Sequence, residues 1–209
     1  MVNHIFKLVL TALLLWLTVL AAQMGYANLH FFSANNQVDR WEKKAEITSQ
    51  NSYNRALQSI KLSNQLHPNN PKYIETLGII QEWAVYGEYA DNTNFSLALS
   101  SYQKSAQLRP LWPWSWSAKA MTKWRLKEID DELWHALEML SKTGPYTKDS
   151  NLVLLDICLM LIKKETIYAD RATALAKKHY QQSMTNSRIK SALNKLIKRR
   201  EAEELVANW

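Results

Sequence analysis

The sequence has few of the residues that cross-link a chain or interrupt its helices. Its 209 residues include one cysteine, four glycines and five prolines. The single cysteine, Cys158, excludes an intrachain disulfide and a zinc site built from several cysteines. A domain of many short strands would need more turn residues, so this composition favours long helices joined by a few tight corners. Hydrophobic residues make up 47% and charged residues 22%, which argues against general disorder and against a protein with many membrane spans.

Charged residues are missing from residues 8–38. Within this stretch the apolar run 8–22, LVLTALLLWLTVLAA, has 15 residues, the upper length of a signal-peptide core. Adding residues 23–26 gives 19, which is enough to cross a bilayer. The length therefore fits both a signal peptide and a transmembrane anchor.

Two interpretations of this apolar segment remain open. Small residues precede plausible signal-peptidase cuts after Ala22 and after Ala27, which favours a cleaved signal. Aromatic residues beyond the span could instead form the interfacial belt of an uncleaved anchor; they are Tyr26, Phe31 and Phe32.

Positive charges flank the apolar run on both sides. Lys7 is adjacent to the run, whereas Arg40, Lys43 and Lys44 lie farther away on the other side. A very short N-terminal tail with a close positive charge usually stays in the cytoplasm. We therefore expect a single-pass protein of the bacterial inner membrane with most of the chain in the periplasm.

The chain contains an internal repeat. Residues 55–68, RALQSIKLSNQLHP, match residues 97–110, LALSSYQKSAQLRP, at 7 of 14 positions without a gap. Small, bulky and small residues recur at helical spacing before a proline, which is the pattern of the second helix of a tetratricopeptide unit. The small residues let two antiparallel helices approach, the bulky one fills the gap between neighbouring units, and the proline ends the helix.

The remaining helices follow from periodicity and from helix-stop signals. The first helix of the next unit should cover residues 73–90, and Gly144 with Pro145 should end the third unit. Lys119 occupies a position where the pattern has a large apolar residue. The other expected helices cover residues 114–126, 130–140, 151–163, 167–182 and 188–207.

We therefore expect an all-α fold, a short irregular tetratricopeptide-like helical-repeat array preceded by one N-terminal hydrophobic helix. The helix at 151–163 should be the most buried one and should hold Cys158 as a core residue. The expected organisation is an anchor or signal at 1–27, a linker at 28–40, repeats at 41–146, and C-terminal helices with a basic face at 147–209 in the same domain.

The sequence offers no convincing catalytic or metal site. Its five histidines have no metal-ligand spacing, and four glycines provide no phosphate-binding loop. The consecutive residues Asp130, Asp131 and Glu132 point in different directions on a helix and cannot flank one glycosidic bond. We predict a protein that is not an enzyme and has no cofactor and no bound metal.

Tryptophans form the first candidate binding site. Five of the nine tryptophans fall within 23 residues, most densely in RPLWPWSW. Their rings could stack on sugars or on a partner, or they could simply pack one helical pair onto the next. The candidate partner-binding residues are Arg109, Trp112, Trp114, Trp116 and Trp124.

A basic segment forms the second candidate site. Residues 171–200 contain nine basic and no acidic residues. Such a face could attract an anionic glycan or lipid, or it could be an ordinary solvated helix surface. No nucleic-acid-binding motif accompanies it, so nucleic acid is not an expected partner. The candidate anion-binding residues are Arg188, Lys190, Lys195, Lys198, Arg199 and Arg200.

Residues 108–146 resemble the signature of the VpsP-type family of bacterial polysaccharide-biosynthesis proteins. The elements that carry this resemblance are the R-P-x-W-P-x-x-W motif at 109–116, the K-W-R-L-x-E-x-D corner at 123–130, and the G-P-Y stop at 144–146. The resemblance implies a membrane-anchored accessory protein of capsule or exopolysaccharide assembly that has no catalytic residue. It also implies an uncleaved anchor and a protein partner in the envelope polysaccharide machinery. Lys119 departs from the apolar residue usual at its position.

Overall fold

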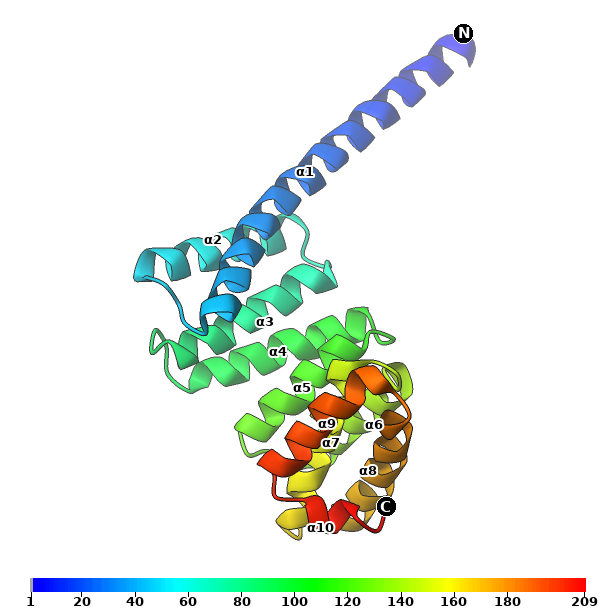
Figure 1. Cartoon of the computed structure of the whole chain (residues 1–209). Coiled ribbons are helices and arrows are strands. Elements are labelled where there is room, and N and C mark those ends of the chain that lie inside the picture. Colours follow the sequence, from blue (N-terminus) through cyan, green and yellow to red (C-terminus); the bar gives the residue numbers. More distant parts are fainter. Residues whose placement is uncertain (1) are drawn as a thin grey trace. The chain divides into compact units, whose positions relative to one another are not determined.

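The structure, a computed structural model, describes residues 2–209 and contains ten helices and no strand in that range (Figure 1). The predicted all-α class with one N-terminal hydrophobic helix is confirmed. The chain divides into two compact units, Met1–Leu108 and Arg109–Trp209, which are described separately below. This division lies inside the region 41–146 that the sequence assigned to one repeat array.

The first unit consists of four helices: α1 (Val2–Lys44), α2 (Gln50–Leu66), α3 (Pro71–Tyr86) and α4 (Thr93–Leu108). Helix α1 packs on α2, and α3 packs on α4. Side-chain caps fix two of the helix starts, because Ser49 accepts a hydrogen bond from the Ser52 amide and Asn70 accepts from the Lys72 amide. Helix α3 ends at Tyr86, earlier than expected, because the chain turns at Gly87.

Helix α1 continues without interruption from the apolar segment into the core of this unit (Figure 1). The expected linker at 28–40 is wrong, since the structure shows these residues as helix. They contain several Asn, Ser and Gln residues, and their only Asp, Glu, Lys or Arg residues are Asp39 and Arg40. Apolar side chains nevertheless recur every three or four residues there and are buried against α2 and α3; they are Ala27, Phe31, Ala34, Val38 and Trp41.

The two helical pairs of this unit share equivalent contacts. The hydroxyl of Ser63 donates to the carbonyl of Ala27, with 2.9 Å between the oxygen atoms. The hydroxyl of Ser105, 42 residues later, donates to the carbonyl of Pro71 at 3.1 Å. In each pair, a serine near the end of the second helix thus bonds the backbone of the first helix.

A small residue also permits the close approach of α3 and α4. A Cβ atom added to Gly78 would lie 2.7 Å from Cε1 of Tyr102, well inside normal contact distance. Tyr102 was expected to fill the gap between neighbouring units. Its ring packs on Gly78 of the first helix of its own pair.

The second unit contains α5 (Pro113–Arg125), α6 (Asp131–Thr143), α7 (Lys148–Lys163), α8 (Ala169–Met184), α9 (Ser187–Arg199) and α10 (Glu203–Val206). Helix α5 packs on α6, α7 on α8, and α9 contacts both α7 and α8. The single helix expected at 188–207 is wrong. It divides into α9 and α10 because the chain turns at Glu201, whose φ of 49° is left-handed.

The corners of this protein use few glycines. Gly144 ends α6 as expected, but its φ of −125° is accessible to any residue. What requires glycine there is space, since an added Cβ would lie 2.7 Å from Cβ of Pro113. Non-glycine residues with left-handed φ follow five of the helices instead; they are Ala45, Glu88, Lys127, Glu165 and Glu201.

Helix α7 has eight buried residues, as its apolar sequence predicts. Cys158 is among them and is completely buried, which raises the pKa of its thiol to about 12. The thiol is therefore a protonated core group at neutral pH.

A buried hydrogen-bond network joins three helices of the second unit. Nδ1 of His179 lies 2.6 Å from Oδ1 of Asn151, and Nε2 lies 2.7 Å from the hydroxyl of Ser141. Asn151 uses its amide nitrogen to donate to the carbonyl of Pro145, so its Oδ1 is left to accept from Nδ1 of the histidine. Burial, followed by the charge of Lys178, lowers the pKa of His179 to about 4. The network therefore fits a neutral imidazole that donates from Nδ1 and accepts at Nε2.

Candidate functional site

One helix in the described part of the chain, α1, is long and apolar enough to cross a membrane. The most apolar part of this helix has no buried residue. Large exposed side chains extend from Ile5 to Val19 and include Trp16. The helix thus has the composition of a membrane anchor or of a signal sequence.

The five candidate residues of the aromatic site do not form a single cluster. Trp116 is buried, its indole nitrogen donates to the carbonyl of Pro110 at 2.8 Å, and its ring meets the ring of His135 edge to face. These contacts are those of a packing residue. Trp124 is half-buried, with the ammonium of Lys164 5.3 Å from its ring centre.

The other members of this set are exposed at the corner before α5. Trp112 and Trp114 are 37% and 43% exposed, and Leu111, which precedes Trp112, is 81% exposed. The guanidinium carbon of Arg109 lies 3.9 Å above the ring of Trp112, a cation–π contact that holds the indole in place. We call Leu111, Trp112 and Trp114 the aromatic corner.

A cluster of ion pairs that the sequence did not predict joins α5 to α6. Nζ of Lys123 lies 2.8 Å from Oε2 of Glu128 and 2.9 Å from Oδ2 of Asp130, although only 3% of the lysine side chain is exposed. Lys119, one turn earlier, is also buried and lies 3.5 Å from Oε2 of Glu132. A lysine thus takes the expected apolar position because a carboxylate of α6 reaches its ammonium.

The electrostatics of this cluster are those of stable ion pairs. Burial acts to lower the pKa of Lys123, but hydrogen bonds to Glu128 and Asp130 outweigh it, and the pKa is raised. Burial acts to raise the pKa of Asp130, but the bond from Lys123 prevails and the pKa is lowered. Asp130 also caps α6 by accepting from the Leu133 amide at 2.9 Å. The charge of Lys119 lowers the pKa of Glu132.

The basic candidates lie on and just after α9. This helix buries Ile189, Leu193, Leu196 and Ile197. Arg200 is half-buried, and its Nη2 lies 3.0 Å from Oδ2 of Asp156 on α7. The other five basic candidates are exposed; they are Arg188, Lys190, Lys195, Lys198 and Arg199.

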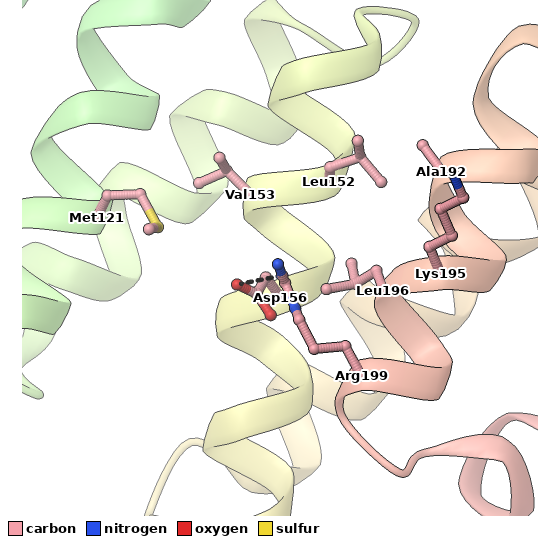
Figure 2. A pocket seen from close by; sticks show the side chains of 8 residues that line it. All are labelled: Met121, Leu152, Val153, Asp156, Ala192, Lys195, Leu196 and Arg199. Atoms are coloured by element: carbon pink, nitrogen blue, oxygen red, sulfur yellow. Dashed lines mark hydrogen bonds and ion pairs between the residues drawn. The ribbon is translucent and has the colours of Figure 1, made fainter. Parts of the chain in front are cut away.

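Two of these cations line a pocket of about 360 Å³ in the second unit (Figure 2). Lys195 and Arg199 lie at its side on α9, and Asp156 faces them from α7. Asp156 is paired with Arg199 at 3.5 Å and with Arg200, so its negative charge is compensated. The rest of the lining is apolar and consists of Met121, Leu152, Val153, Ala192 and Leu196.

Sequence reasoning missed the acidic member of this pocket, although the sequence contains a signal for it. Asp156 is the only charged residue between residues 149 and 163, within the most apolar helix of the second unit. A carboxylate in that position needs a cationic partner, because burying it alone would be costly. The nearby arginines supply that partner.

Among the described residues, no group of three or more His, Cys, Asp or Glu is placed to hold a metal ion. No protein-family model matches the sequence, and a search of curated proteins gives no significant match. The resemblance carried by residues 108–146 therefore stays a prediction.

Proposed function

We propose that this chain is a non-enzymatic, single-pass membrane-anchored accessory protein whose helical body docks a protein partner. The observation that supports this most is the continuity of α1, which carries the apolar segment directly into the packed core of the first unit. The resemblance of residues 108–146 favours capsule or exopolysaccharide synthesis or export as the process.

The contacts of α1 favour an anchor that is retained. A cut after Ala27 would remove a residue that is completely buried and whose carbonyl accepts from Ser63. A cut after Ala22 would leave the packed turns in place, with the bond from Gln23 to the carbonyl of Leu66 at 2.9 Å, so these contacts argue against the cut after Ala27.

The charges around α1 favour a body in the periplasm. Lys7 is adjacent to the apolar run, whereas Arg40 lies 14 residues beyond Tyr26, about 21 Å along an uninterrupted helix. That distance is more than twice the Debye length at physiological salt, roughly 8 Å. Lys7 is thus the cation best placed to keep its end of the helix in the cytoplasm.

We interpret the helical pairs as irregular tetratricopeptide-like units, which commonly serve as docking platforms. The matching bonds of Ser63 and Ser105 support this interpretation for the first two pairs. In this interpretation, residues 27–44 of α1 form the first helix of the first unit.

The aromatic corner is the surface best suited to a protein partner. Exposed tryptophan and leucine side chains are unfavourable in water, and tryptophan is enriched at protein interfaces. A photo-crosslinking residue at Leu111, tested in cells that make the polymer, should capture one defined envelope protein. The same residue at Ile167, which is 89% exposed and lies outside the corner, is the matched control. Equal capture at both positions would contradict this assignment.

A second candidate function, binding of an anionic lipid or glycan, is favoured by the pocket of Figure 2. Its apolar lining and its two cations suit a ligand with an anionic group attached to an apolar body. Replacing Lys195 with Gln should weaken binding to phosphatidylglycerol vesicles and reduce its salt dependence, whereas Lys190→Gln, outside the lining, should change it less. Equal effects of the two substitutions would exclude the pocket as the site.

A further inference from the structure

Hydrogen bonds fix the position of one helix corner along the axis of α1, relative to its apolar part. Gln23 on α1 donates to the carbonyl of Leu66 at the end of α2. Asn28 accepts from the hydroxyl of Tyr73, in the first turn of α3, at 3.3 Å. The corner between α2 and α3, residues 67–72, is therefore level with residues 23–28 of α1.

This level is also the expected edge of the bilayer core. The 19 residues from 8 to 26 span about 28 Å as a helix, close to the roughly 30 Å of a hydrocarbon core. The bilayer edge thus falls near Tyr26, where a headgroup layer of roughly 5–7 Å begins, and the corner, level with residues 23–28, lies at that edge.

The residues at this level have the chemistry of a membrane interface. Apart from His67, the corner consists of asparagine, proline and lysine, and Pro68 and Asn69 are exposed. The carboxylate of the nearby Glu75 is buried and bonds Lys72 at 2.9 Å. On α1, apolar side chains continue on the exposed face from the end of the span onward; they are Tyr26, Leu29 and Phe32.

The net charge of the first unit changes sign along the same axis. Because the helices alternate in direction, the corner end carries Lys61, Lys72 and Lys104, and its only carboxylate is the buried Glu75. Ser105 bonds Pro71, which brings the end of α4 to this corner. The other six acidic residues of the folded part lie toward the opposite end together with four basic ones, so that end has a small net negative charge; they are Asp39, Glu42, Glu46, Glu82, Glu88 and Asp91, with Arg40, Lys43, Lys44 and Arg55.

From these observations we infer that the α2–α3 corner, with the exposed residues Tyr26, Leu29 and Phe32, forms a membrane-contact face embedded in phospholipid headgroups. The inference rests on the proposed retained anchor. It adds that the first unit is seated on the bilayer in one orientation, rather than tethered at a distance. Lysines at this face meet anionic headgroups, while the acidic end points away from the membrane.

The test uses the full-length chain, with Cys158→Ala, in vesicles of phosphatidylethanolamine and phosphatidylglycerol. A single bimane-labelled cysteine is placed at Leu14, Asn69 or Asn92, and lipids with a nitroxide near the headgroup or in the acyl chain act as quenchers. Asn69 and Asn92 form a matched pair, since both are exposed asparagines in helix corners at opposite ends of α3. Circular dichroism verifies that each labelled chain is folded.

We expect acyl-chain nitroxides to quench the bimane label at position 14. Headgroup nitroxides should remove about half or more of the emission from the label at position 69. They should remove little at position 92, which lies about 22 Å farther along α3. Quenching of Leu14 with equal, weak quenching at Asn69 and Asn92 would overturn the contact face and leave the anchor standing. No quenching at Leu14 would overturn the anchor itself, and the inference with it.

Discussion

The buried histidine of the second unit gives a quantitative prediction for stability against pH. The pKa of His179 falls from 6.5 to about 4 on folding, because burial disfavours its charged form. A lowered histidine pKa means that the unfolded chain takes up a proton at a higher pH than the folded one. The neutral ring therefore makes its full contribution to the free energy of unfolding above pH 6.5. This contribution is lost as the pH falls toward 4. At 1.4 kcal/mol per pKa unit, the loss at pH 4 is roughly 3 kcal/mol.

The comparison is made with His179→Gln, which cannot titrate. At pH 7.5 the variant should be less stable by about 1–3 kcal/mol, because the bonds to Ser141 and Asn151 are disturbed. Urea unfolding in detergent between pH 7.5 and 4 should show the two stabilities converging as the pH falls. The free energy of unfolding of His135→Gln, a substitution at an exposed histidine, should instead keep a constant difference from that of the parent chain across this pH range. Parallel curves for the parent and His179→Gln would refute the neutral, buried imidazole.

Three further substitutions or reactions test other parts of the fold. Lys123→Met should lower the free energy of unfolding by about 1–3 kcal/mol, because the carboxylates of Glu128 and Asp130 lose their cation while remaining partly hydrated. Urea unfolding at two salt concentrations measures this loss. Gly78→Ala should cost about 1–3 kcal/mol through its clash with the Tyr102 ring, and adding Tyr102→Leu should restore part of the loss in thermal unfolding. Cys158 should resist a thiol reagent at pH 8 until urea unfolds the chain, and rapid labelling of the folded protein would contradict its burial.

Much of the fold could be predicted from residues that act locally. The scarcity of glycine and proline indicated long helices, and the match between residues 55–68 and 97–110 located α2 and α4. The linker at 28–40 was mispredicted because its polar residues hid the apolar positions between them. Those apolar positions indicate a packed helix only when α2 and α3 are known to pack on them, and that packing belongs to the tertiary structure.

The candidate sites show the same limit. The sequence could group Trp112 with Trp116, but it could not tell that one is exposed and the other bonds a carbonyl in the interior. It also placed Lys195 and Arg199 in one basic segment without showing that they flank an apolar pocket. Pockets formed between helices depend on crossing geometry, and a pattern along one helix does not contain it.

The central claim is that the apolar segment is retained and is part of the folded body. It is tested most directly by the intact mass of the chain recovered from membranes after washing with alkaline carbonate. The account predicts the full 24.3 kDa in the washed membrane fraction. A chain shortened to begin after Ala22 or Ala27, and released by the wash, would contradict it.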